Sequence, residues 1–108
     1  MSAFSPSGAG STVNLNVGLK TNPIIYNLQL TNSGTEYSQA LPSGTKSFLV
    51  RIRSLSKCEL RYVSMSSNYL TLPAGTTYTE QRIDGSSSLT LYLSATKDGQ
   101  LAEIVAWT

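Results

Sequence analysis

The sequence repeats Leu41-Pro42-Ser43-Gly44-Thr45 as Leu72-Pro73-Ala74-Gly75-Thr76, and this repeated phrase decides the predicted fold. Proline fixes φ at about −65° and glycine adopts positive φ without steric cost, so Pro-x-Gly is typical of a tight turn. Proline also lacks the N–H group that a central strand donates to its neighbour. Each copy therefore predicts a corner between two strands, and we expect the corners to begin successive strands at corresponding ends of the molecule.

Short strand-like stretches separated by turn signals fill the chain on both sides of the corners. In residues 12–19, for example, apolar side chains alternate strictly with polar residues and glycine, as in a half-buried strand. No stretch keeps the apolar period of about 3.6 residues that an amphipathic helix needs. The predicted strands span residues 12–19, 24–31, 36–41, 46–53, 57–65, 69–72, 77–83, 88–94 and 101–107. We predict an all-β chain: a single-domain antiparallel β-sandwich, jelly-roll-like, with an immunoglobulin-like sandwich as the alternative.

The direction of the side chains predicts which strands pair. Strands 46–53 and 57–65 are expected to form a hairpin, because one register points both apolar sets to the same face. That register places Ile52 opposite Cys58 and Arg51 opposite Glu59. The Asp98-Gly99 pair predicts a second hairpin before the last strand. The residues expected to point inward are Phe48, Val50, Ile52, Cys58, Leu60, Tyr62, Leu89, Leu91 and Leu93, while Ile24, Tyr26, Leu28 and Leu30 are expected to share one face of their strand.

The composition is that of one small domain with few charges. The chain has 108 residues, of which 13% are charged, and its net charge is +2. Lysine and arginine are too few and too dispersed for a nucleic-acid surface. No apolar run approaches the length of a membrane-spanning helix, and no secretory signal is visible at the N-terminus. The single cysteine, Cys58, cannot form a disulfide within the chain, which fits a reducing compartment.

The sequence carries no signature of catalysis. It has no histidine, which removes the commonest general base and the commonest metal ligand. Cys58 is expected to face the core, where a free thiol behaves as a small apolar side chain. The six carboxylates show neither the spacing of a calcium loop nor that of a glycosidase pair. We therefore predict that the protein is not an enzyme and uses no metal and no cofactor.

Residues 1–11 are small and are predicted to form a flexible N-terminal arm in front of a β-sandwich domain at residues 12–108. Phe4 is the one large apolar side chain of this arm, and Pro6 stiffens the backbone close to it. We expect both residues to contact a neighbouring subunit.

Four aromatic residues are predicted to be exposed: Tyr37, Tyr69, Tyr92 and Trp107. Large rings, particularly those with an apolar body and a polar tip, suit contacts between subunits, so the sequence favours an interface role for all four. The alternative is a platform on which sugar rings stack.

Three stretches resemble small structural proteins of tailed bacteriophages, of the capsid decoration (cement) type. They are Tyr37–Phe48, Tyr69–Glu80 and the ending Ala102–Thr108. The resemblance implies a β-sandwich that sits as a homotrimer on the virion and clamps subunits of the major capsid protein, after assembly in the host cytoplasm. The charge and the apolar runs of the sequence, as described above, predict no nucleic-acid or membrane partner. The alternative function is a carbohydrate-binding or host-adhesion module of a phage tail or head fibre, with a glycan as ligand.

Overall fold

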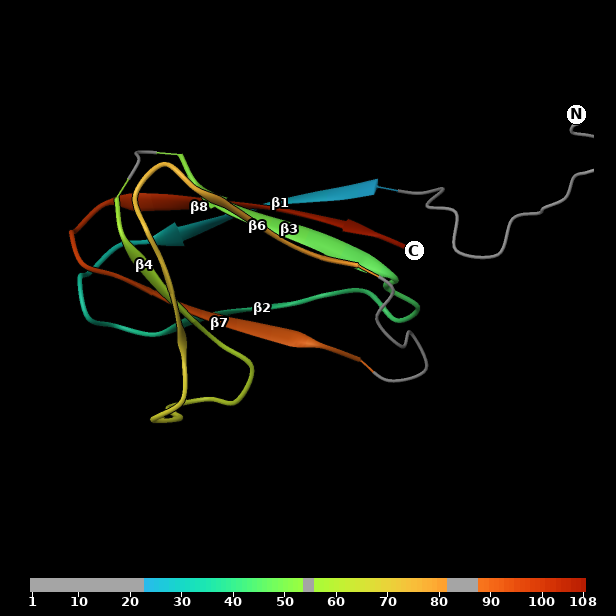
Figure 1. Cartoon of the computed structure of the whole chain (residues 1–108), viewed down its shortest axis with the longest axis horizontal. Helices are drawn as coiled ribbons and strands as arrows, with labels where there is room; N and C mark the ends of the chain where they lie inside the picture. The colour runs from blue at the N-terminus through green and yellow to red at the C-terminus, as the bar shows by residue number, and fades with distance from the viewer. Residues whose placement is uncertain (1–22, 54–55, 82–87) are drawn as a thin grey trace, which may run out of the picture.

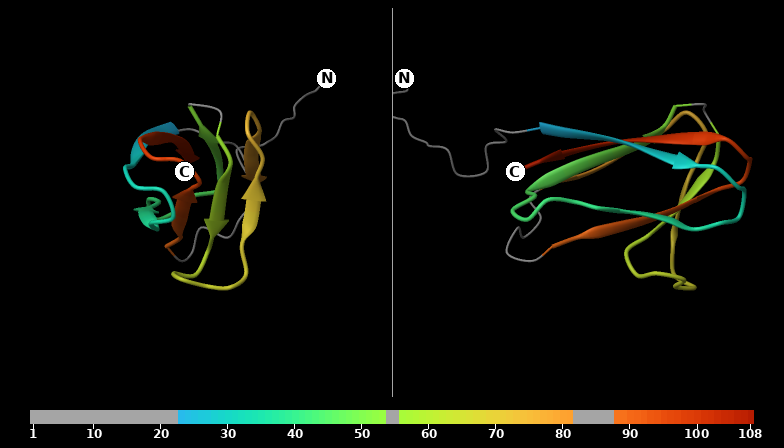
Figure 2. Two further views of the ribbon diagram at one scale, coloured as in Figure 1. Left: turned by 90° about the vertical axis from the view of Figure 1, so that its left-hand side faces the viewer. Right: turned by 180° about the vertical axis from the view of Figure 1, so that it is seen from behind.

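The computed structural model of the chain describes residues 23–53, 56–81 and 88–108, which form two packed antiparallel sheets (Figure 1). The strands are β1 (Pro23–Leu30), β2 (Tyr37–Ala40), β3 (Ser47–Ile52), β4 (Cys58–Arg61), β5 (Leu70–Leu72), β6 (Thr77–Gln81), β7 (Thr90–Ala95) and β8 (Gln100–Trp107). The first sheet has the order β1-β8-β3-β6, and the second has the order β2-β7-β4-β5. Figure 2 shows from behind how β1 and β8 lie over β7.

The strand order makes the sandwich a jelly roll. Successive strands lie in opposite sheets at every step except one, where β4 and β5 pair within the second sheet. Apart from β4 and β5, strands that are neighbours in a sheet are therefore not consecutive in the sequence, as in jelly-roll domains. The predicted all-β, jelly-roll-like sandwich is confirmed.

The core lies between the sheets and follows the predicted alternation. In β3 the buried residues are Phe48, Val50 and Ile52, and in β8 every second side chain is buried. A strand that faces a core on one side requires this period of two. The buried apolar residues are Leu30, Leu41, Phe48, Val50, Ile52, Cys58, Leu60, Leu72, Leu91, Leu93, Ala95, Ala102, Ile104 and Ala106. Leu89, Tyr26 and Leu28 pack against this set from its edge.

Both repeated phrases are corners, and they share one hydrogen-bonding pattern. Thr45 N–H and Oγ1 donate to the Pro42 carbonyl over 3.3 and 2.6 Å, and Thr76 makes the same pair of bonds to Pro73 over 3.2 and 2.7 Å. The glycine before each threonine has positive φ, +86° in Gly44 and +78° in its counterpart. Each corner carries the chain from the second sheet to the first.

The corners nevertheless lie at opposite ends of the sandwich, so their predicted placement at corresponding ends is wrong. They begin β3 and β6, and these two strands pair antiparallel, with Ser47 beside Gln81 and Arg51 beside Thr77. The start of one strand is therefore next to the end of the other.

Both predicted hairpins are wrong for one reason. The connection from β3 to β4 and the Asp98-Gly99 turn between β7 and β8 cross from one sheet to the other. Arg51 consequently lies opposite Glu103 on β8, and Glu59 lies between Ser94 and Thr71. Sequence alternation reports which face a side chain occupies, but both layers of a sandwich have a core-facing side, so alternation does not identify the partner strand.

Strand β4 is shorter than the predicted strand 57–65. It ends at Arg61, and the next residue, Tyr62, is 41% exposed instead of lying in the core. A turn follows, in which Ser66 N–H bonds to the Val63 carbonyl and Met65 has a φ of +57°. The predicted strand 12–19 and the arm at 1–11 lie outside the described residues.

Candidate functional site

The structure places the predicted interface residues in different parts of the molecule. Phe4 and Pro6 lie outside the described residues. Tyr37 packs against the core instead of standing free, and its hydroxyl accepts a hydrogen bond from the Asn32 backbone N–H over 3.0 Å. Trp107 is half-buried on the outer face of the first sheet, where its carbonyl accepts a bond from the Lys46 N–H.

An apolar row crosses the outer face of the first sheet. The registers of β1, β8 and β3 put Ile25, Val105 and Leu49 side by side on this face. Ile25 is 69% exposed, and the other two are half-buried. Two residues further along the same face, Pro23 on β1 lies beside Trp107 on β8. We name Ile25, Val105 and Leu49 the apolar row.

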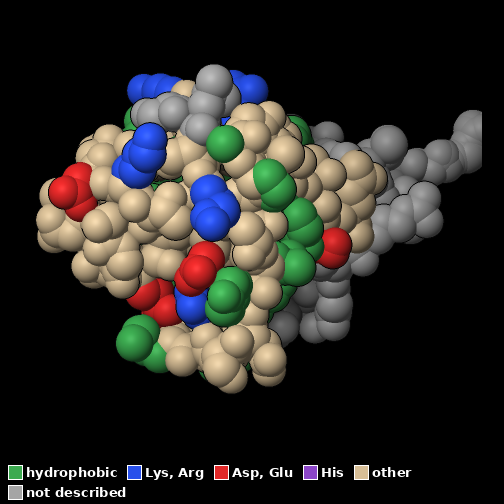
Figure 3. All heavy atoms as spheres, turned by 60° about the vertical axis from the view of Figure 1, so that its left-hand side comes forward, with side chains coloured by type: hydrophobic (Ala, Val, Ile, Leu, Met, Phe, Trp, Pro, Cys, Tyr) green, Lys and Arg blue, Asp and Glu red, His purple; other side chains and the backbone are tan. Residues whose placement is uncertain are grey.

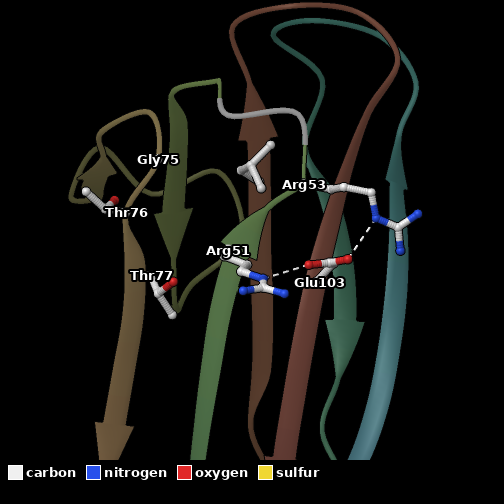
Figure 4. A pocket seen from close by; sticks show the side chains of 7 residues that line it. Arg51, Arg53, Gly75, Thr76, Thr77 and Glu103 are labelled. Atoms are coloured by element: carbon white, nitrogen blue, oxygen red, sulfur yellow. Dashed lines mark hydrogen bonds and ion pairs between the residues drawn. The ribbon is translucent and has the colours of Figure 1, made fainter.

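A charged cluster borders the apolar row on the same face (Figure 4). Arg51 Nε and Arg53 Nε each donate to one oxygen of Glu103 over 2.7 Å. These hydrogen bonds hold the pKa of the Glu103 carboxyl below its usual value. The cluster lines a hollow of about 290 Å³ whose other wall is the second corner, at Thr76 and Thr77.

Two rows of polar and aromatic side chains lie next to each other on the outer face of the second sheet. Tyr92 on β7 lies opposite Arg61 on β4, and Ser94 lies opposite Glu59. The antiparallel pairing of β4 with β5, continued by one residue, brings Tyr69 beside Arg61. The guanidinium carbon of Arg61 lies 4.6 Å from the centre of the Tyr69 ring, which is cation–π geometry.

Glu36 extends the second of these rows. The pairing of β2 with β7, continued by one residue, brings Glu36 beside Ser94. Its carboxylate accepts hydrogen bonds from Ser64 Oγ over 2.7 Å and from the Met65 N–H over 2.9 Å. Those two bonds lower the pKa of Glu36, so the group is ionised at neutral pH. They also fix the turn after β4 against the loop before β2.

Arg61 is the centre of this face and is mostly covered. Its Nε donates to the Ser66 carbonyl over 2.7 Å and its Nη2 to Glu59 Oε1 over 3.0 Å. A longer contact of 3.5 Å joins Nη1 to Ser94 Oγ. A hollow of about 570 Å³ lies over these groups. Its lining residues are Gly34, Thr35, Glu36, Glu59, Arg61, Ser64, Met65 and Ser94.

The β4–β5 connection and the first residue of β5 carry most of the large exposed apolar side chains that the structure describes. They are Tyr62, Val63, Met65, Tyr69 and Leu70, and the others are Ile24 and Ile25 on β1. In Figure 1 this connection lies well away from β1. Figure 3 shows one face of the molecule, on which side chains of Lys and Arg and of Asp and Glu lie among hydrophobic ones.

Two further titratable groups lie in or against the core. Burial raises the pKa of the Cys58 thiol to about 12, so it is uncharged at neutral pH. Burial also raises the pKa of Tyr62, whose hydroxyl lies 3.2 Å from that of Tyr78. Phe48 contacts both tyrosine rings, at centroid distances of 6.4 and 6.1 Å. Tyr62, which follows β4 of the second sheet, therefore contacts Phe48 on β3 and Tyr78 on β6 of the first sheet.

Among residues 23–53, 56–81 and 88–108, no three Asp, Glu, Cys or His side chains come together in a way that could hold a metal ion. Within the same ranges, no helix has the length and apolar character needed to cross a membrane.

Comparisons with known proteins inform the fold alone. No protein-family model matches the chain, and no curated protein sequence matches it. One solved structure with a similar fold is the solution NMR structure of a de novo designed double-stranded β-helix. It is 17% identical, with a TM-score of 0.52, and the match covers 82% of this chain and 100% of the design.

Sequence reasoning found the two tyrosines of the second sheet but missed the charged residues beside them. Alternation along β4 was enough to put Glu59 and Arg61 on one outer face. The mistaken hairpin paired Glu59 with Arg51, however, and so separated it from its true neighbour, Ser94. Knowledge of the jelly-roll strand order would have brought them together.

Proposed function

We propose that the protein is a structural virion protein, which decorates and stabilises a bacteriophage capsid by binding the shell of the major capsid protein as a homotrimer. The observation that carries the proposal is the apolar row of Ile25, Val105 and Leu49. An antiparallel sheet that faces water on one side normally carries polar side chains there. Here three adjacent strands present apolar side chains instead.

The exposed part of Ile25 gives the scale of one such contact. Complete burial of an isoleucine side chain contributes about 1.5–3 kcal/mol. Since 69% of Ile25 is still exposed, covering it would contribute about 1–2 kcal/mol per subunit. One contact of this size is weak, but three copies engaged together on one particle raise the overall affinity steeply.

The resemblance of Tyr37–Phe48, Tyr69–Glu80 and Ala102–Thr108 to capsid decoration proteins supports the same function. In this proposal the protein is not an enzyme and resides on the capsid surface after assembly in the host cytoplasm. The predicted contacts of Phe4 and Pro6 with a neighbouring subunit belong to the proposal as well.

The test compares Ile25→Asp with Gln29→Glu in binding to undecorated shells of the phage that encodes the chain. Both residues are exposed on the outer face of β1, and both variants add one negative charge, but Gln29 lies outside the apolar row. We expect Ile25→Asp to lose shell binding and Gln29→Glu to retain it, with unchanged thermal unfolding in both. Equal binding by the two variants would contradict the role of the row. Light scattering on the isolated protein tests the trimer.

A further inference from the structure

The charged cluster beside the apolar row has a positive charge that its own residues do not balance. Among the described residues, the charged side chains on the outer face of the first sheet are Arg51, Arg53 and Glu103. The side chains of the two arginines are 59% and 55% exposed, whereas that of Glu103 is 20% exposed. Because one carboxylate faces two guanidinium groups, one positive charge is left for a partner to neutralise.

Glu103 holds both guanidinium groups in place and uses only a small part of their hydrogen-bonding capacity. Arg51 and Arg53 each donate through Nε, to different oxygens of Glu103, over 2.7 Å. A guanidinium carries further N–H groups on its two Nη atoms, and no described residue accepts from those atoms. Figure 4 shows the two guanidinium groups on opposite sides of Glu103. Each arginine is therefore an oriented donor for an acceptor of its own, and orientation in advance lowers the entropic cost of binding.

The shape and charge of the cluster select the class of acceptor. Two parallel N–H groups of a guanidinium match the two oxygens of a carboxylate or of a phosphate. A carboxylate carries one negative charge, whereas a phosphate carries more at neutral pH and is repelled more strongly by Glu103. Thr77 on β6 lies beside Arg51 and lines the same hollow of about 290 Å³, so its hydroxyl group is a further donor there. The cluster therefore fits carboxylates best.

The charged cluster and the apolar row form one continuous surface. Val105 and Glu103 alternate with inward residues along β8, as Leu49 and Arg51 do along β3, so the two features occupy neighbouring rows of the same face. Protein interfaces combine an apolar centre with a polar rim, and arginine is enriched in them. A surface that fits both features is that of a protein with carboxylates next to apolar side chains.

We infer that the outer face of the first sheet docks an acidic protein surface, whose carboxylates are bound by Arg51 and Arg53 on the two sides of Glu103 while the apolar row packs beside them. The inference rests on the proposed function for the identity of the partner, which is then an acidic patch of the major capsid protein. The binding of carboxylates by the two arginines can be measured without a capsid.

The first experiment measures carboxylate binding in solution. Heteronuclear NMR spectra of the isotope-labelled full-length protein are recorded during titration with a hexaglutamate peptide and, separately, with inorganic phosphate. We expect hexaglutamate to shift the Nε–H signals of Arg51 and Arg53, and phosphate at the same concentration to shift them less. Unchanged arginine signals, or tighter binding of phosphate, would overturn the inference.

Three variants test the assignment of these residues. Arg51→Gln and Arg53→Gln each remove one guanidinium, and each should weaken hexaglutamate binding by about two- to fivefold. Lys97→Gln removes the same charge from an exposed residue between β7 and β8, and should leave binding unchanged. Equal weakening in all three variants would show attraction by net charge alone and would contradict the site. Thermal unfolding establishes that the variants are folded.

Binding to undecorated phage shells separates this inference from the proposed function. The double variant Arg51→Gln/Arg53→Gln should bind shells more slowly than the wild type and with a weaker dependence on salt, whereas Lys97→Gln should match the wild type. Shell binding that is unaffected by the double substitution would overturn the inference and leave the proposed function standing. Shells that bind no wild-type protein would overturn the proposed function, and the hexaglutamate titration would still decide whether the arginines bind carboxylates.

Discussion

The two corners allow a matched test of how burial sets the strength of one hydrogen bond. Thr45 and Thr76 end the same five-residue phrase and donate their hydroxyl groups to equivalent proline carbonyls, over 2.6 and 2.7 Å. Their surroundings differ, because Thr45 is 3% exposed whereas Thr76 is exposed. The substitutions Thr45→Val and Thr76→Val remove each hydroxyl and keep the size of the side chain.

The expected losses of stability follow from this difference in burial. A typical intramolecular hydrogen bond contributes about 0.5–1.5 kcal/mol, and a buried acceptor left without its partner adds to the loss. We therefore expect Thr45→Val to lower the free energy of unfolding by about 1–2 kcal/mol. At the exposed corner water replaces the hydroxyl, so Thr76→Val should cost less than about 0.5 kcal/mol.

Urea unfolding followed by fluorescence measures both losses of stability. If the unfolding free energy depends equally steeply on urea concentration in wild type and variants, their folded and unfolded states expose the same surface. The double variant is the control. Because the corners lie at opposite ends of the sandwich, its loss should equal the sum of the single losses within about 0.5 kcal/mol. Equal losses for the two single variants would refute the argument from burial. Strong non-additivity would refute the separation of the corners.

Three other predictions concern single side chains. Cys58 is fully buried and the pKa of its thiol is raised to about 12, so iodoacetamide should leave it unmodified in the native protein and alkylate it in urea, as read by mass spectrometry. Glu103 has a lowered pKa because Arg51 and Arg53 donate to it, so its contribution to stability is present above its ordinary value of 4.5 and is lost as pH falls through the lower folded value. Between pH 4.5 and the lower folded value, the stability of Glu103→Gln should accordingly depend less on pH than that of the wild type, and parallel pH dependences would contradict the pairing. Ser47 Oγ is buried without a hydrogen-bond partner among the described residues, so Ser47→Ala should leave stability unchanged or raise it by up to about 1 kcal/mol in calorimetry, and a loss of more than about 1 kcal/mol would reveal a missed partner.

The elements of this fold could be predicted from sequence because each is specified locally. Alternation identified the core side of β3, β4 and β7, and Pro-x-Gly identified both corners. These signals depend on the period of a strand and on backbone sterics, which act within a few residues. They do not depend on which strand lies next to which.

The candidate site could not be assembled in the same way, because strand partners are chosen over long separations. Arg51 meets Glu103 across 52 residues, and Arg61 contacts Ser94 across 33. An interleaved sandwich separates strands that are neighbours in sequence, so a hairpin assumption places outward-facing charges beside the wrong partners. The same limit explains why Tyr69 and Tyr92 were recognised singly and not as two members of one row.

We propose above all that the protein binds a capsid shell. Under this proposal the chain is encoded by a phage. The most direct measurement is quantitative mass spectrometry of purified particles of that phage, which compares the copy number of the chain with that of the major capsid protein. We predict a fixed simple ratio that falls when the chain carries Ile25→Asp and is preserved with Gln29→Glu. Particles that contain no copies of the chain would contradict the claim.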